Sequence, residues 1–161
     1  MLHRRSLVLA PFLLAVLAGC ETATKPADTD DAANRGGGQG SGPGSEQDFR
    51  TNVGDRVFFS FDGYDLSPEA RATLTKQAAW LRQYAQYRIT IEGHCDERGT
   101  REYNLALGER RAISVKSFLV AQGLPAARIE TLSYGKERPE VIGSDESAWA
   151  RNRRGVTVLR R

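Results

Sequence analysis

One arginine of this 161-residue sequence stands where the local pattern predicts an apolar side chain. Residues 101–122 repeat apolar positions with the period of an amphipathic helix, and Arg111 falls on the apolar face between Leu107 and Val115. Because removing an unpaired guanidinium from water costs several kcal/mol, Arg111 requires an anionic or polar partner. Asp96, on the segment that precedes this helix, is the candidate partner.

The residues alone leave two roles open for Asp96 and Arg111. They can form a buried ion pair that locks the helix to the preceding loop, which is a purely structural role. Alternatively, each charge waits for one half of a zwitterionic ligand. The carboxylate of Asp96 would then hold an ammonium, and the guanidinium of Arg111 would hold a carboxylate through two parallel hydrogen bonds.

A thiol and an imidazole directly before Asp96 raise the question of catalysis or metal binding. Cys95 beside His94 is compatible with a cysteine nucleophile or a zinc ligand. However, adjacent residues on an extended segment point to opposite sides, and residues 49–161 contain no further His or Cys to complete a ligand set. We therefore predict no enzymatic activity, no metal site and no cofactor, and we interpret Cys95 as a free thiol.

The hydrophobic pattern around these residues predicts a small α/β domain. Strands are predicted over residues 56–61, 88–93, 128–134 and 155–159, and helices over residues 67–86 and 101–122, with one helical turn near residues 144–150. On the first strand, Val57, Phe59 and Phe61 share one face. The order β-α-β-α-β-β predicts an α+β sandwich in which the two helices cover one face of a small mixed sheet.

The N-terminus has the build of a bacterial export signal. Residues 1–19 place two arginines before an apolar run that is too short to span a bilayer comfortably. The run ends at residues 17–20 in Leu-Ala-Gly-Cys, which resembles the lipobox of bacterial lipoproteins, so Cys20 is predicted to carry a diacylglycerol and an N-acyl chain. The alternative is an ordinary cleaved signal with a chance cysteine. Glu21 after the cysteine, in place of Asp, favours the outer membrane.

The charge of the chain is divided unevenly among its segments. The net charge is +3, with +2 on residues 1–19, −4 on residues 20–48 and +5 on residues 49–161. The middle segment is rich in glycine and cannot bury enough apolar surface to fold, so we predict a flexible tether. The last segment suffices for one domain. It lacks a lysine-rich stripe and interleaved aromatic residues, which argues against a nucleic-acid partner.

Several short motifs together resemble the OmpA-like C-terminal domain family. They follow the family's order and spacing across residues 56–161, and they are specific as a set rather than singly. The matching stretches are Phe59–Asp65, Gly93–Thr100, Tyr103–Asn104, Leu107–Ala112, Ser133–Lys136 and Asn152–Arg154. Together with the lipobox, they make the chain similar to the wall-binding lipoproteins of this family.

The resemblance implies non-covalent binding of peptidoglycan through the diaminopimelate of its stem peptide. In the family, the residues that match Asp96 and Arg111 grip the amino-acid end of this ligand. The turn after the first strand lines the same pocket in related domains, and two further residues face it by their spacing on the second helix. The predicted site therefore consists of Asp96, Arg111, Phe61, Asp62, Tyr64, Asn104 and Leu107.

Three other residues are interpreted with the family pattern in view. Arg153 and Arg154 match a family motif before the last strand, and we interpret Arg153 as a structural brace while the role of Arg154 stays open. Cys95 departs from the pattern, because the family usually carries Ala or Thr at that position.

The resemblance also implies partners and a cellular role. Lipoproteins of this kind bind the periplasmic protein TolB and, within the Tol-Pal system, link the outer membrane to the cell wall and support its invagination during cell division. The expected location is the outer membrane, with a lipid anchor and the folded domain in the periplasm. The alternatives are a wall-binding lipoprotein outside the Tol-Pal system and a periplasmic hydrolase that uses Cys95 or His94.

Overall fold

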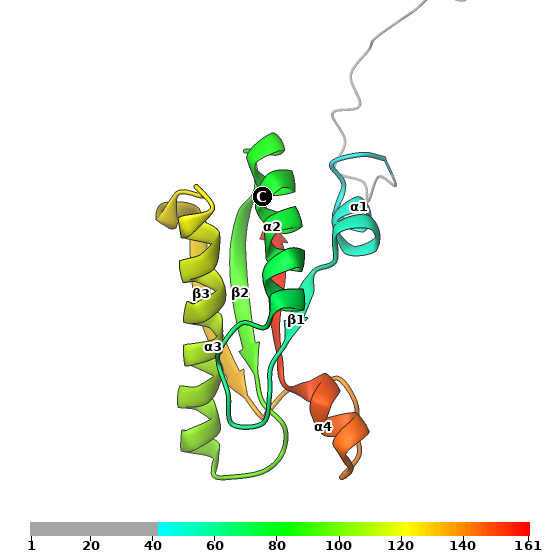
Figure 1. Cartoon of the computed structure of the whole chain (residues 1–161), viewed down its shortest axis with the longest axis vertical. Helices are drawn as coiled ribbons and strands as arrows, with labels where there is room; N and C mark the ends of the chain where they lie inside the picture. Colours follow the sequence, from blue (N-terminus) through cyan, green and yellow to red (C-terminus); the bar gives the residue numbers. More distant parts are fainter. Residues whose placement is uncertain (1–41) are drawn as a thin grey trace, which may run out of the picture. The chain divides into compact units, whose positions relative to one another are not determined.

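The structure is a computed structural model that describes residues 42–161, and Figure 1 shows its elements. The predicted signal peptide, the lipid attachment site Cys20 and most of the predicted tether lie outside the described residues. The elements are α1 (Glu46–Asp48), a π-helical turn (Phe49–Val53), β1 (Arg56–Phe58), α2 (Pro68–Gln83), β2 (Arg88–His94), α3 (Arg101–Ala121), a 3₁₀ turn (Ala126–Arg128), β3 (Ile129–Gly135), α4 (Glu146–Asn152) and β4 (Arg154–Arg160).

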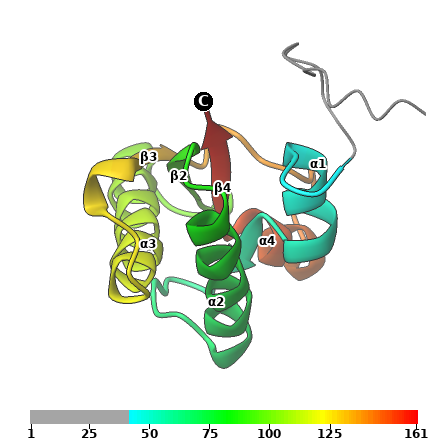
Figure 2. The ribbon, with the colours of Figure 1, turned by 90° about the horizontal axis from the view of Figure 1, so that it is seen from above.

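The described residues form one four-stranded mixed sheet with the order β1-β4-β2-β3. β4 pairs antiparallel with both β1 and β2, whereas β2 and β3 are parallel and are joined through α3. Seen from above, α2 and α3 lie side by side on one face of this sheet (Figure 2). The predicted α+β sandwich with two helices on one face of a mixed sheet is therefore confirmed.

The core lies between the two long helices and the sheet. Leu74 and Leu81 of α2, Ile91 of β2 and Leu119 of α3 are fully buried. The sequence sets the start of each helix through a side chain that accepts a backbone N–H: Ser67 caps α2 in front of a proline, and a threonine caps α3. The stripe of apolar side chains on each helix then decides which face turns to the sheet.

Two element ends differ from the prediction by three residues. α2 ends at Gln83 rather than near residue 86, because Tyr84 leaves the helical conformation and the chain turns to bury Tyr87. β1 ends at Phe58, three residues before the predicted end of the strand. Phe59 is still buried, but Phe61 is 62% exposed, so the predicted face shared by Val57, Phe59 and Phe61 does not extend to Phe61.

The folded part begins earlier than residue 49. Phe49 is buried with its ring 4.9 Å from that of Trp80, and Trp80 Nε1 donates a hydrogen bond to Asp48 Oδ2 at 2.8 Å. The hydroxyl of Tyr87 donates to the carbonyl of Gly44 at 2.9 Å. The last residues of the predicted tether are therefore fastened to the domain by aromatic side chains of α2 and of the turn after it. No helix in residues 42–161 is long and apolar enough to cross a membrane.

Candidate functional site

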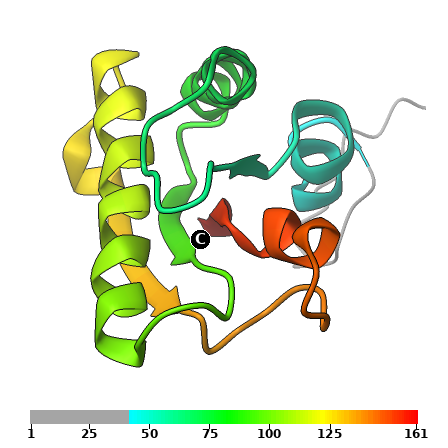
Figure 3. The same cartoon turned by 60° about the horizontal axis from the view of Figure 1, so that its bottom comes forward.

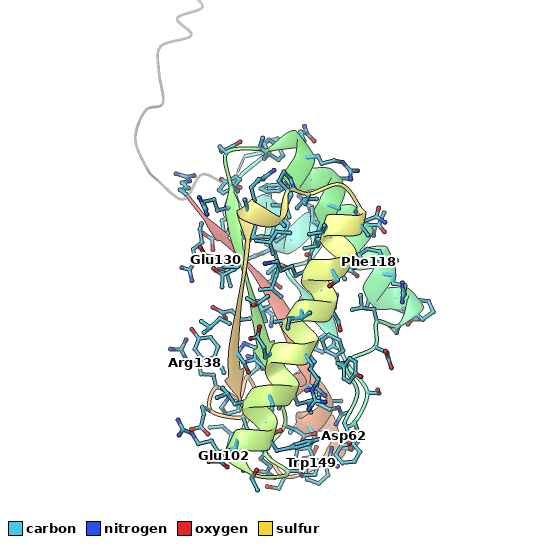
Figure 4. The ribbon with its side chains drawn as sticks, turned by 90° about the vertical axis from the view of Figure 1, so that its left-hand side faces the viewer. Asp62, Glu102, Phe118, Glu130, Arg138 and Trp149 are labelled. Carbon is cyan, nitrogen blue, oxygen red and sulfur yellow. The ribbon has the colours of Figure 1, made fainter. Side chains whose placement is uncertain are left out.

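A pocket of about 210 Å³ lies at the end of the domain where α3 begins. Three segments meet there: the loop between β1 and α2, the loop between β2 and α3, and the first turns of α3 (Figure 3). Its lining includes six of the seven predicted site residues, Phe61, Asp62, Asp96, Asn104, Leu107 and Arg111, together with four that were not predicted to bind the ligand, Cys95, Arg98, Gly99 and Tyr103. Figure 4 shows Asp62 near this end, with Glu102 of α3 and Trp149 of α4.

The seventh predicted residue, Tyr64, does not line this pocket. Its side chain is 42% exposed, and its ring lies 5.8 Å from the guanidinium carbon of Arg110 on the outer side of α3. The reason is the turn before it: Asp62 adopts a φ of 55°, which is rare for a residue other than glycine, and redirects the chain. The sequence spacing suggested the right loop but could not show which of its side chains turn inward.

Arg111 is buried, as the helical pattern predicted, but its partners are not the predicted ones. Its guanidinium donates three hydrogen bonds to backbone carbonyls: Nε to Gly63 at 2.8 Å, Nη1 to His94 at 2.8 Å and Nη2 to Ser60 at 3.1 Å. The predicted ion pair with Asp96 is therefore absent among the described residues. Two of these carbonyls, of Ser60 and Gly63, belong to the loop between β1 and α2, and the third, of His94, ends β2.

This pairing leaves a positive charge in the pocket wall. Burial lowers the pKa of Arg111, because neutral carbonyls compensate only in part for the lost hydration. A guanidinium has five N–H groups, and the three bonds leave one on each terminal nitrogen without an oxygen acceptor among residues 42–161, where the Cys95 thiol is the remaining neighbour. Arg111 is thus prepared to bind a carboxylate through two hydrogen bonds.

Asp96 is buried in the lining of the same pocket and is paired with two arginines. Arg98 donates to it from its backbone N–H and from two guanidinium nitrogens, the shortest bond being 2.6 Å from Nη2 to Oδ2. Arg153 Nη1 donates to the same Oδ2 at 3.2 Å. Burial raises the pKa of the Asp96 carboxyl, but the hydrogen bonds from Arg98 and Arg153 outweigh this effect and hold the pKa below its usual range.

Arg98 is the main site residue that the sequence did not reveal. Its guanidinium carbon lies 4.1 Å from the ring centre of Phe61 and 4.1 Å from that of Trp149, so two aromatic rings contact it. Trp149 belongs to α4 and is held by a hydrogen bond from Nε1 to Glu97 Oε1 at 3.0 Å. The three groups come from positions 61, 98 and 149, and no sequence spacing connects them.

Two side chains hold the loop between β2 and α3 in place. Asn104 is buried, and its Nδ2 donates to the carbonyls of Arg98 at 2.7 Å and Thr100 at 3.0 Å. Lys136 Nζ donates to the carbonyls of Glu97 at 3.1 Å and Gly99 at 2.6 Å. The loop backbone that carries Asp96 and Arg98 is therefore fixed at four carbonyls.

The geometry does not support nucleophilic catalysis by Cys95 or His94. Burial raises the pKa of the Cys95 thiol, and its Sγ donates to the carbonyl of Asn104 at 3.3 Å. Burial lowers the pKa of His94 to about 4, and its ring stacks on Tyr134 at 5.4 Å. The thiolate that a cysteine nucleophile requires is thus disfavoured. No group of three or more potential metal-ligating residues occurs in the described part of the chain.

Arg153 and Arg154, at the start of β4, contact other parts of the framework. Arg153 joins three segments, because it donates to the carbonyl of Phe59 at 3.1 Å, to Asp96 at 3.2 Å and to Glu146 at 2.6 Å. The predicted brace is therefore present, and it also fixes Asp96. Arg154, whose role was open, pairs with Glu140 at 2.9 Å away from the pocket lining.

Comparison with known proteins identifies close relatives of this chain. The family model described as the OmpA family matches residues 58–153. The peptidoglycan-associated lipoprotein of Rhizobium meliloti (strain 1021) is 52% identical over 157 residues, which cover 97% of this chain and 88% of the relative. The protein of the same name from Haemophilus influenzae is 41% identical over 143 residues, which cover 89% of this chain and 90% of the relative.

Solved structures agree with these relatives. The crystal structure of the peptidoglycan-associated lipoprotein from Burkholderia pseudomallei matches with a TM-score of 0.66 at 41% identity, covering 69% of this chain and 96% of that chain. The OmpA-like domain of FopA1 from Francisella tularensis, at 21% identity and a TM-score of 0.56, shares the fold. The relatives form a family of binding proteins rather than enzymes, as the sequence predicted.

Proposed function

Because this chain belongs to the OmpA family and, within it, to the peptidoglycan-associated lipoproteins, we propose that its pocket binds the peptidoglycan stem peptide non-covalently. The ligand is the free amino-acid end of diaminopimelate, which carries an ammonium and a carboxylate on one carbon. The pocket provides one acidic and one basic group for these charges, Asp96 and Arg111.

The observation that carries this proposal is the environment of Arg111. It is a buried cation in the pocket wall whose protein partners are three neutral carbonyls, and two of its N–H groups remain for a ligand. A ligand carboxylate would give this guanidinium the negative partner that the described residues do not supply. A bidentate contact also selects the planar carboxylate over a neutral amide of similar size.

The anchoring and the cellular role are further parts of the proposal. Cys20 carries a diacylglycerol and an N-acyl chain in the outer membrane. These two or three acyl chains together anchor the protein stably, whereas a single chain would not. The tether between Cys20 and the domain lets the pocket reach the wall. TolB is the proposed partner within the Tol-Pal system, in which the protein links the outer membrane to the wall and supports its invagination at division. The names of the relatives support the lipoprotein and wall-binding parts of this role.

Co-sedimentation with isolated peptidoglycan sacculi tests the pocket. The variants are Arg111→Lys, which keeps the charge but cannot form the bidentate contact, and Arg110→Lys, the same substitution one residue earlier on the exposed side of α3. We expect Arg110→Lys to sediment like the wild type and Arg111→Lys to lose at least about tenfold in affinity. Undiminished binding by Arg111→Lys would overturn the proposed pocket.

Separate experiments test the anchor and the partner. Metabolic labelling with a radioactive fatty acid should mark the wild type and not Cys20→Ser; label that survives the substitution would refute lipidation at this residue. Cross-linking in cells followed by purification should recover TolB with the wild type. Absence of TolB, with wall binding intact, would instead favour a wall-binding lipoprotein outside the Tol-Pal system.

A further inference from the structure

The carboxylate of Asp96 has no free acceptor position in this structure. A carboxylate offers about four lone-pair positions, two on each oxygen. Oδ1 accepts from the backbone N–H and Nε of Arg98, both at 3.2 Å, and Oδ2 accepts from Arg98 Nη2 at 2.6 Å and Arg153 Nη1 at 3.2 Å. A ligand ammonium can therefore reach Asp96 only if one of these donors leaves.

The two arginines differ in their freedom to leave. The side chain of Arg153 is 7% exposed and is bonded to a backbone carbonyl and to Glu146 as well, so it is part of the framework. The side chain of Arg98 is 31% exposed. Within residues 42–161, its guanidinium hydrogen-bonds only to Asp96 and stacks only on the rings of Phe61 and Trp149. Arg98 is the donor that can move.

A second acceptor for Arg98 lies next to its present position. Glu146 Oε2 is 4.0 Å from Arg98 Nη2, and the Glu146 side chain is 65% exposed. Glu146 and Trp149 are both on α4, one turn apart, so a guanidinium that leaves Asp96 can pair with Glu146 while it stays in contact with the indole ring. The Arg98 side chain thus has two alternative positions, one paired with Asp96 and one paired with Glu146.

From these contacts we propose that the Arg98 guanidinium lies where the ligand ammonium binds, and that the ammonium displaces it from Asp96 toward Glu146. This inference rests on the proposed binding of a zwitterionic amino-acid end. Arg98 then determines specificity. A ligand must supply an ammonium for Asp96 to replace Arg98 and a carboxylate for Arg111 to make the exchange favourable.

Removal of the competitor tests the inference. Binding of a soluble diaminopimelate-containing stem peptide to the purified full-length chain would be measured by calorimetry for the wild type, Arg98→Ala and Arg98→Gln. We expect Arg98→Ala to bind about three- to tenfold more tightly, because the ligand no longer displaces a partly exposed, hydrogen-bonded cation. We expect Arg98→Gln, which keeps donor groups without the charge, to bind with intermediate affinity. If the amine at the free end of diaminopimelate is acetylated, the affinity of the peptide should not increase with either substitution.

A spectroscopic measurement follows the displacement itself. The chain has two tryptophans, and only Trp149 contacts Arg98. Addition of the stem peptide should therefore change tryptophan emission in the wild type, and this change should be lost in Trp149→Phe and in Arg98→Ala. Trp149→Phe keeps an aromatic ring for the guanidinium and serves as the matched control.

The outcomes separate this inference from the proposed function. If the wild type binds the peptide, Arg111→Lys does not and Arg98→Ala binds equally or more weakly, the displacement of Arg98 is refuted while the pocket stands. If the wild type does not bind, or if Arg111→Lys binds as well as the wild type, the proposed function itself fails. Circular dichroism of each variant shows whether it is folded, and if Arg98→Ala is not, Arg98→Gln decides the matter.

Discussion

Gly93 of β2 and Gly108 of α3 are in direct backbone contact. A Cβ atom added to Gly93 would lie 1.9 Å from the carbonyl oxygen of Gly108, and one added to Gly108 would lie 3.0 Å from the carbonyl oxygen of Gly93. No other residue type permits this approach of helix to strand. The contact matters for the pocket, because it brings Arg111, less than one turn further along α3, to the carbonyl of His94 beside Gly93.

The first prediction concerns this contact. Gly93→Ala should lower the free energy of unfolding by about 3 kcal/mol, because the new methyl group meets backbone atoms that cannot move independently of α3. It should also weaken wall binding by shifting Arg111. Urea unfolding followed by circular dichroism measures the first effect. Gly42→Ala is the control, since its Cβ would meet nothing within 4 Å. Equal midpoints for the two variants would contradict the prediction.

A second prediction concerns Arg153, which joins the segment after β1, the Asp96 loop and α4. Arg153→Met should lower the free energy of unfolding by about 2 kcal/mol, because Asp96 stays buried with Arg98 as its remaining cation and the carbonyl of Phe59 loses a donor. The matched control is Arg151→Met, an exposed arginine two residues earlier in the last turn of α4. Chemical unfolding compares the two, and similar losses from both would show that Arg153 is not a brace.

A third prediction concerns pH. The folded-state pKa of His94 is about 4, below its ordinary value near 6.5, because burial and the nearby guanidinium of Arg154 disfavour the imidazolium. The unfolded chain therefore takes up this proton first, and stability contributed by the neutral ring is complete above pH 6.5 and is lost as the pH falls toward 4. The loss should amount to about 3 kcal/mol across this window.

Replacement of this histidine is the control for the pH effect. His94→Phe keeps a ring against Tyr134 and removes two nitrogens that have no hydrogen-bond partner among the described residues. His94 is also the only histidine in residues 42–161. Unfolding free energies measured between pH 7 and pH 5 should fall in the wild type and stay level in His94→Phe. Parallel curves for the two proteins would assign the dependence to other groups.

A fourth prediction concerns the thiol of Cys95. Burial raises its pKa, and its Sγ is bonded to the carbonyl of Asn104, so the folded chain holds little reactive thiolate at pH 8. Iodoacetamide should modify Cys95 in the native protein on the order of a hundredfold more slowly than in the urea-unfolded protein. Peptide mass spectrometry locates the label. Rapid modification of the native chain at this residue would show that the pocket opens more often than its packing implies.

Several features of the site follow from local sequence. The helical period places Arg111 among apolar side chains without reference to any other element, because an α-helix repeats every 3.6 residues. Ser67 and Thr100 begin their helices by capping, and the element order β-α-β-α-β-β leads to a mixed sheet covered on one face. Such properties depend on residues a few positions apart, which is the range over which sequence patterns are informative.

Contacts between segments that are distant in the sequence could not be predicted from local patterns. The partners of Arg111 were predicted wrongly because its three acceptors are backbone carbonyls, which every residue carries and which no side-chain pattern marks. Tyr64 was predicted to line the pocket and does not, because one residue with positive φ, Asp62, turns the chain two positions before it. The start of the domain at Gly44–Asp48 depends on aromatic side chains some 30 to 40 residues away.

By itself, the sequence determined that a buried cation and a nearby carboxylate lie at one end of a small α+β sandwich, and that the chain resembles a family of wall-binding lipoproteins. Only the tertiary structure decided how these charges are satisfied: Arg111 by carbonyls, and Asp96 by Arg98 and Arg153. The physical reason is that the tendency of a side chain to be buried or hydrated depends on its residue type and can be inferred from sequence. A hydrogen bond instead requires two atoms within about 3 Å of each other. That distance is set by the packing of α3 on β2, through two glycines that touch.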